Sequence, residues 1–212
     1  MVEPDHLVLA ARDLDVGAAW LEQRLGVTLA AGGRHDRMGT HNRLLGLGDS
    51  FYLELIAIDP QAPPPGRPRW FGLDSPGALP VDRPSLIHWV VRSDDIQRDA
   101  AASTEALGDI LPMERGDYRW RITVPPDGHL PGKGLLPTVI QWDVRFHPAG
   151  RLPDAGCRLM KLEGFHPQPA GIKLALASLG LGARLDVHAC AVDEAEQLVA
   201  YIRTPRGLVE LD

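Results

Sequence analysis

The chain has few of the features that mark secreted, membrane-spanning or thiol-dependent proteins. It contains only two cysteines among 212 residues, Cys157 and Cys190, and no CxxC motif, which predicts ordinary thiols rather than a disulfide framework or a catalytic cysteine. No apolar run approaches the ~18 residues that a membrane span requires. The N-terminal residues also lack the basic and apolar regions of a signal peptide. We therefore expect a cytoplasmic protein with no membrane partner.

Basic patches are also missing. The net charge is −6, the Lys and Arg residues are scattered, and no basic stripe alternates with aromatic residues. This pattern predicts no nucleic-acid partner and no binding to an anionic membrane surface. The run Gly132-Lys133-Gly134 lacks the spacing of a phosphate-binding loop, so Lys133 is expected to be solvated.

What the chain does have is an internal repeat. In each copy, a strand-like run carries a residue that marks the repeat, and an amphipathic segment follows it. A glycine lies 20 residues after the marked residue in every copy. Three extended runs follow each glycine, so each unit is predicted to be β-α-β-β-β. The marked residues and their glycines are His6 and Gly26, His88 and Gly108, and Met160 and Gly180.

The repeat predicts the fold class. We expect an α+β fold in which tandem β-α-β-β-β modules form one curved, cup-shaped mixed sheet with the helices outside, plus a third C-terminal module of the same plan. The predicted first and second modules are 1–60 and 84–150, separated by a Pro-rich linker at 61–83. The third module, 156–212, carries Met160 where the others have histidine. It is expected to be structural, packing across the first two or mediating a homodimer.

Local patterns set the expected orientations. Leu7 and Leu9 point to one face of the first strand, whereas His6, Val8 and Ala10 point to the other, the inside of the cup. A helix is predicted between an N-cap at Asp13 and Gly26. The apolar stripe of this helix should be Leu14, Ala18, Leu21 and Leu25, and that of the second module Ile96, Ala100, Ser103 and Leu107.

Two aromatic residues of the linker, Trp70 and Phe71, should pack over another part of the molecule. They either cover a sheet edge or line a ligand pocket, and the sequence leaves both alternatives open. The Gly- and Pro-rich loop at 125–137 is expected to form the rim or lid of a site.

A metal site is predicted on the concave face. Glu54 is a carboxylate in an otherwise apolar strand, and it needs an arginine, a hydrogen-bond network or a metal as a partner. Equivalent strands would bring His6, His88, Glu54 and Gln141 to one face of the curved sheet. Two imidazoles and a carboxylate bind divalent first-row metals and leave positions open, so Zn, Ni, Mn or Fe is the expected cofactor.

This arrangement resembles the vicinal oxygen chelate superfamily, and the chain looks most like its glyoxalase-like domain proteins. The resemblance implies paired modules and, in the enzymes, a divalent metal held by the first and fourth strands of each module, here His6, Glu54, His88 and Gln141. At Gln141 relatives often have a carboxylate. The matching segments are DHLVLA at 5–10, GGRHDRMGTHNRLLGLGD at 32–49, YLELIA at 52–57, RPRWFGLD at 67–74 and IQWDVRFHP at 140–148.

The expected function is a metal-dependent enzyme on a small oxygenated substrate, with the metal as a Lewis acid on a carbonyl or enediolate. Glu54 is the predicted base, His41 is a weaker candidate, and His35 and Asn42 are candidate pocket residues. Oxygen chemistry at Fe(II) is a related option. A metal-free protein that binds a small molecule in the same cup is the alternative. The remaining histidines are expected to be surface or structural residues: His129, His147, His166 and His188.

Overall fold

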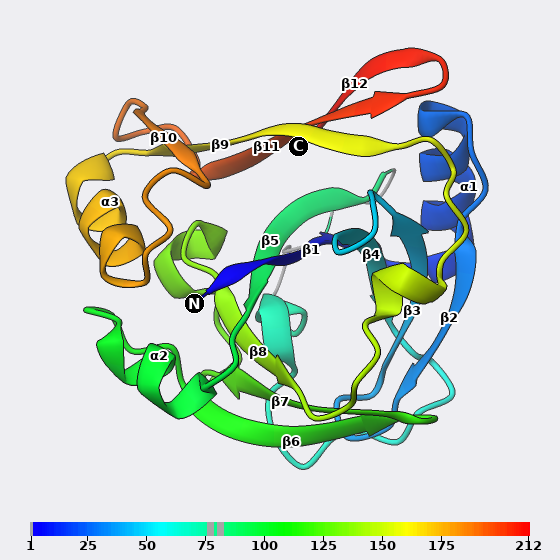
Figure 1. The fold of residues 1–212 in the computed structure, drawn as a ribbon, viewed down its shortest axis with the longest axis horizontal. Coiled ribbons are helices and arrows are strands. Elements are labelled where there is room, and N and C mark those ends of the chain that lie inside the picture. Colours follow the sequence, from blue (N-terminus) through cyan, green and yellow to red (C-terminus); the bar gives the residue numbers. More distant parts are fainter. Residues whose placement is uncertain (1, 76–78, 80–82) are drawn as a thin grey trace.

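A computed structural model describes residues 2–75, 79 and 83–212 of the chain. One curved sheet of eight strands, in the order β2-β3-β4-β1-β5-β8-β7-β6, and one sheet of four strands, in the order β10-β9-β11-β12, account for the strands. Figure 1 shows the larger sheet curling around the centre of the molecule, with α1 and α2 on its outside and the smaller sheet across one side. The predicted α+β fold with a cup-shaped mixed sheet is confirmed.

The first half of the large sheet comes from the N-terminal unit. Strand β4 runs parallel to β1, and β3 and β2 follow it in antiparallel pairing. The second half repeats this order from β5, since β8 runs parallel to β5 and pairs in turn with β7. The elements of the first unit are β1 (Glu3–Ala10), α1 (Leu14–Leu25), β2 (Ala30–His35), β3 (Thr40–Gly46) and β4 (Tyr52–Ile58). Those of the second are β5 (Ser85–Arg92), α2 (Ile96–Ala102), β6 (Asp109–Arg115), β7 (Tyr118–Val124) and β8 (Thr138–Trp142).

The two halves join where β1 and β5 pair antiparallel, with Val8 opposite His88. The outer strands β2 and β6 approach each other across the cup. The guanidinium of Arg37 donates to the carbonyl of Pro112 at 2.8 Å, which ties the turn after β2 to β6. Short 3-10 segments lie in the connections: η1 (Trp70–Gly72), η2 (Pro131–Gly134) and η3 (Pro148–Arg151).

The third unit has the expected order of elements but pairs its strands differently. Its second strand runs parallel to its first, whereas among the described residues the second strand of each earlier unit pairs only with the strand that follows it. A separate sheet therefore forms instead of an extension of the cup. The elements are β9 (Arg158–His166), α3 (Pro169–Ser178), β10 (Asp186–Ala189), β11 (Gln197–Thr204) and β12 (Gly207–Leu211).

The alternation predicted for the first strand is confirmed. Leu7 and Leu9 belong to the larger core, which lies between the outer face of the curved sheet, α1 and the third unit. Val8 and Ala10 belong to a second core inside the cup. The side chain of Asp13 caps α1, and Gly26 ends it in the left-handed conformation with φ 72°. Each face of the sheet is therefore covered by its own apolar cluster.

The helix of the second unit is shorter than expected. Its N-cap is Asp95, but it ends at Ala102, and Ser103 is extended with ψ 136°. The hydroxyl of Ser103 accepts from the amide of Glu105 at 3.2 Å, which is the competition with helical hydrogen bonds that serine and threonine provide. The predicted stripe through Ser103 to Leu107 is therefore wrong as a helix, although Leu107 still reaches the core.

Among the residues that the structure describes, no helix combines the length and the apolar character needed to cross a membrane.

Candidate functional site

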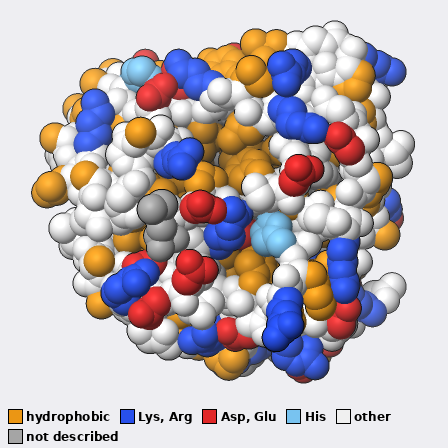
Figure 2. Space-filling view, viewed as in Figure 1, with side chains coloured by type: hydrophobic (Ala, Val, Ile, Leu, Met, Phe, Trp, Pro, Cys, Tyr) orange, Lys and Arg blue, Asp and Glu red, His pale blue; other side chains and the backbone are white. Residues whose placement is uncertain are grey.

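A cup lies on the inner face of the curved sheet. Figure 2 shows hydrophobic side chains in a central hollow of this side of the molecule, surrounded by charged side chains. The space inside the cup is small, about 20 Å³ for the centre of a water-sized sphere, which suffices for about one water molecule. The cup is lined by His6, His35, Tyr52, Glu54, Trp70, Phe71, Arg115, Trp120, Ile122, Ile140 and Trp142.

Glu54 is the carboxylate of the cup. Strand β4 directs it inward, and the residue is only 6% exposed. The amide nitrogen of Asn42 donates to Glu54 Oε1 at 2.5 Å, and Asn42 Oδ1 accepts from the amide of Gly33 at 2.8 Å. No lysine or arginine within the described part of the chain forms an ion pair with Glu54. A buried carboxylate is therefore held by a hydrogen-bond network, which was one of the three predicted alternatives.

His6 faces Glu54 by the alternation of β1, and a bulge brings its neighbour Asp5 to the same side. The pairing of β1 with β5 shifts register between Pro4 and His6, so the neighbours Asp5 and His6 can both contribute to the inner side. His6 Nδ1 lies 2.6 Å from Asp5 Oδ1, while His6 Nε2 lies 3.7 Å from Glu54 Oε2. That second distance is too long for a direct hydrogen bond and leaves room for an intervening atom.

Asp5 is fully buried and well supplied with donors. Its Oδ2 accepts from Trp142 Nε1 and from His147 Nε2, each at 2.9 Å. Burial alone would raise the pKa of Asp5, but the hydrogen bonds from His147 and His6 outweigh it and hold the pKa well below its usual range. The ionised carboxylate keeps the proton of His6 on Nδ1, and Nε2 is left facing the cup.

His35 lies beside Glu54 on the other side. Its Nε2 is 3.9 Å from Glu54 Oε1 and 3.1 Å from the guanidinium Nη1 of Arg115. Since arginine can only donate, this nitrogen of His35 accepts, and Nδ1 carries the proton toward Thr40 Oγ1 at 3.0 Å. Burial, followed by the charge of Arg115, lowers the pKa of His35 well below its ordinary value. His35 is therefore neutral.

Trp70 and Phe71 close the cup from the linker. Trp70 meets His35 edge to face with ring centroids 5.1 Å apart, and Phe71 packs near His88 at 5.5 Å. Phe71 has φ 58° and ψ 24°, a left-handed conformation that is rare for a bulky side chain. Of the two alternatives that the sequence left open, the structure places both residues in the lining of the cup.

The structure does not bring His88 and Gln141 into one ligand set with His6 and Glu54. Both ring nitrogens of His88 already have partners, the carbonyl of Gly134 at 3.1 Å and Thr138, whose hydroxyl lies at 2.9 Å. Gln141 accepts from the amide of Ile96 at 2.9 Å. Its neighbours Ile140 and Trp142 line the cup, so Gln141 faces the opposite side of β8, toward α2.

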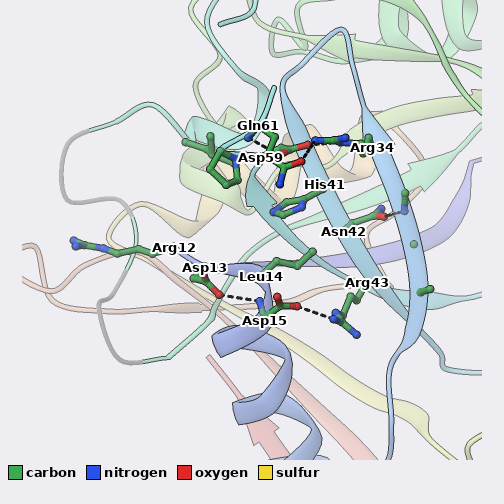
Figure 3. A pocket seen from close by; sticks show the side chains of 15 residues that line it. Arg12, Asp13, Leu14, Asp15, Arg34, His41, Asn42, Arg43, Asp59 and Gln61 are labelled. Atoms are coloured by element: carbon green, nitrogen blue, oxygen red, sulfur yellow. Dashed lines mark hydrogen bonds and ion pairs between the residues drawn. The ribbon is translucent and has the colours of Figure 1, made fainter. Parts of the chain in front are cut away.

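His41 also lies outside the cup. Strand alternation directs it to the face opposite Asn42, where it lines an outer cavity of about 630 Å³ between β2, β3 and the start of α1. Figure 3 shows His41 pointing into this cavity near the ion pair of Arg34 with Asp59. The structure therefore separates His41 from Glu54.

The residues of the cup offer a divalent ion few free donors. No group of three or more His, Cys, Asp or Glu residues in a metal-binding arrangement occurs within the described ranges. His6 Nε2 and Glu54 Oε2 are the two donor atoms that remain open to a common point. The four-residue set implied by the resemblance does not fit this arrangement.

Several residues of the site were not predicted. Asp5 was missed because regular alternation would point it away from the cup, and only the bulge changes this. His147 was expected to be a surface or structural residue, yet it reaches Asp5. Arg115 has no signal in the sequence, because its position depends on how β6 approaches β2 across the cup.

The curved sheet of two β-α-β-β-β units around an inward carboxylate and imidazole defines a fold of the vicinal oxygen chelate superfamily. A family model described as "Glyoxalase-like domain" matches residues 5–180. The chain belongs to this glyoxalase-like domain family, as the sequence motifs indicated. No match was found among curated proteins.

The chain is similar in fold to a solved structure. A hypothetical protein from Staphylococcus aureus is 12% identical with a TM-score of 0.59, and the match covers 99% of this chain and 84% of that one. Methylmalonyl-CoA epimerase from Mycobacterium tuberculosis is 22% identical with a TM-score of 0.44, and the match covers 66% of this chain and 86% of that one.

Proposed function

We propose that the protein is an enzyme that removes and returns a proton at a carbon next to a carbonyl group of a small substrate, with Glu54 as the base. The observation that carries the proposal is the state of this carboxylate. It is buried, it has no Lys or Arg partner within the described chain, and its Oε2 faces His6 Nε2 across the small space inside the cup. A carboxylate in such a place is poised for proton transfer.

The neighbours of Glu54 suit this role. Asn42 fixes Oε1, which leaves Oε2 as the atom that takes the proton from carbon. With a proton on both ring nitrogens, His6, held in place through Asp5, can then donate the proton on Nε2 to the substrate oxygen that becomes negative. Return of both protons regenerates the enzyme, and the reaction is an isomerisation or epimerisation without a co-reactant.

We further propose that a divalent metal ion binds in the cup. His6 and Glu54 would hold it, and when bound it would act as a Lewis acid on the substrate oxygen. Titration calorimetry with Zn, Ni, Mn and Fe(II) tests it. Binding that His6→Gln weakens by about tenfold or more supports the ion. Equal heats of binding in wild type and variant would exclude a metal ion held by His6. The proton transfer described above does not depend on the ion.

A metal-free binding protein is the second candidate, and the aromatic lining of the cup favours it. Trp70, Phe71, Trp120 and Trp142 would then move apart to enclose a flat apolar ligand without chemistry, since the space between them holds about one water molecule. The enzyme would turn over a substrate, whereas the binding protein would not.

A cytoplasmic location and a homodimer remain predictions.

Hydrogen exchange is the test of the enzyme. We would incubate small 2-oxo compounds with the protein in D2O and follow loss of the proton next to the carbonyl by NMR. Glu54→Gln keeps the shape and the contact with Asn42 but lacks the base, so exchange should fall by about a thousandfold. The matched control is Glu210→Gln, the same change at an exposed glutamate of the third unit. Wild-type exchange no faster than that of Glu54→Gln would exclude this function.

A further inference from the structure

Arg115 brings a positive charge to the cup without a carboxylate to neutralise it. It ends β6 and lines the cup together with Glu54. Within the ranges that the structure describes, no Asp or Glu lies within ion-pair distance of its guanidinium. Its one polar contact there is with His35 Nε2 at 3.1 Å, and His35 is neutral. The arginine is thus positioned by an imidazole that accepts from it and does not cancel its charge.

The path of Arg115 into the cup depends on a glycine. A Cβ atom at Gly33 would come within 2.7 Å of Arg115 Cδ, so a side chain at this point of β2 would push the arginine away. Arg115 also lines a wider cavity of about 560 Å³ between β2 and the turn after β6. It therefore lies between the solvent side and the carboxylate of Glu54, where an incoming ligand would meet it first.

A second donor in the cup lacks a partner. The indole Nε1 of Trp70 is buried and makes no hydrogen bond with any described residue, and Trp70 is only 3% exposed. An unpaired buried donor is destabilising, and such a group in a native protein requires an acceptor. Trp70 lines the same small cavity as Arg115. An oxygen of a ligand in this cavity would satisfy it.

We infer that Arg115 and the indole N–H of Trp70 form a carboxylate-binding site beside Glu54, so that the substrate is a small carboxylate with a reactive carbon next to its anionic group. The inference rests on the proposed function. The planar guanidinium matches a carboxylate, and its charge offsets the repulsion that Glu54 exerts on an anionic substrate. When Glu54 takes the proton from carbon, the electron pair of the C–H bond moves onto the substrate oxygen. The same donors hold that oxygen.

The experiment uses pyruvate, lactate and malonate as anionic probes and pyruvamide as a neutral one. Binding is followed by calorimetry and by the NMR signal of the Trp70 indole N–H. Wild type should bind at least one anion more tightly than pyruvamide. Arg115→Gln should weaken that anion by about tenfold or more, the loss of a charged hydrogen bond, and leave pyruvamide unchanged. The control is Arg119→Gln, an exposed arginine beyond the turn, which should bind like wild type.

The outcomes separate this inference from the proposed function. If no anion binds below about 10 mM, or if Arg115→Gln binds it as tightly as wild type, the carboxylate site is wrong even where exchange of neutral carbonyl compounds persists. If the anion binds through Arg115 and shifts the Trp70 signal but exchanges no proton, the binding site stands and the enzyme does not. Glu54→Gln, which lacks the repelling charge, should bind the anion at least as tightly as wild type.

Discussion

The two halves of the cup have the same order of elements but use their marked histidines differently. His6 in the first half has one ring nitrogen on Asp5 and the other facing Glu54 across 3.7 Å. His88 in the second half has both ring nitrogens bonded to Gly134 and Thr138. Equivalent positions of a repeat thus make different contacts, one in the candidate site and one in the packing of β5 against β8. A repeat in the sequence predicts position, and it does not predict hydrogen-bond partners.

The largest expected effect concerns the stability of the protein in acid. Burial lowers the pKa of His88 to about 3 from its ordinary value of 6.5. Below about pH 6.5 the unfolded chain therefore takes up a proton that the folded chain does not. The free energy of unfolding therefore does not depend on His88 above that pH. Between about pH 6.5 and pH 3 it falls by about 1.4 kcal/mol per pH unit because of this residue. His35, whose pKa is also lowered, adds to the same slope.

Urea unfolding between pH 4 and 7 measures this slope. We expect His88→Gln to flatten it by about one proton. A slope in His88→Gln identical to that of wild type would mean that His88 is not kept neutral by the fold.

A smaller effect concerns the linker that closes both halves. Phe71 is left-handed, so Phe71→Gly should be more stable than Phe71→Ala by about 1 kcal/mol, the reverse of the usual order. Both variants lose the same packing on His88 apart from one methyl group. At Trp70, which is not left-handed, the glycine variant should be the less stable of its pair. Equal stabilities of the two Phe71 variants would show that no strain is present at this position.

The sequence predicted much of the fold and less of the site. Spacing between His6 and Gly26 and its recurrence predicted the modules, because strand and helix periodicities are local properties of the chain. Glu54 was identified because a polar residue in an apolar strand needs a partner, whereas Asn42 was named only as a candidate pocket residue. Asp5, Arg115 and the partners of His88 were not identified, because a bulge, the approach of two sheet edges and the loop before β8 decide them. These features depend on contacts between residues that are distant in sequence.

The third unit resembles the other two in the order of its elements but not in the way its strands pair. The order of elements was correct, but strand order within a sheet depends on which strand edges meet. That β10 pairs with β9 leaves the unit outside the cup, where it covers the outer core. Neither Met160 nor Glu210 lines the cup.

The most direct test of the account compares His6→Gln with His88→Gln in two measurements on each protein, the rate of proton exchange and the free energy of unfolding. We predict that His6→Gln lowers exchange by about a hundredfold and changes stability by less than about 1 kcal/mol. His88→Gln should lower stability by about 2 kcal/mol, while exchange per folded molecule stays within about threefold of wild type. If His88→Gln abolishes exchange as His6→Gln does, with the fold intact, both histidines act in one centre and the division between the two halves is contradicted.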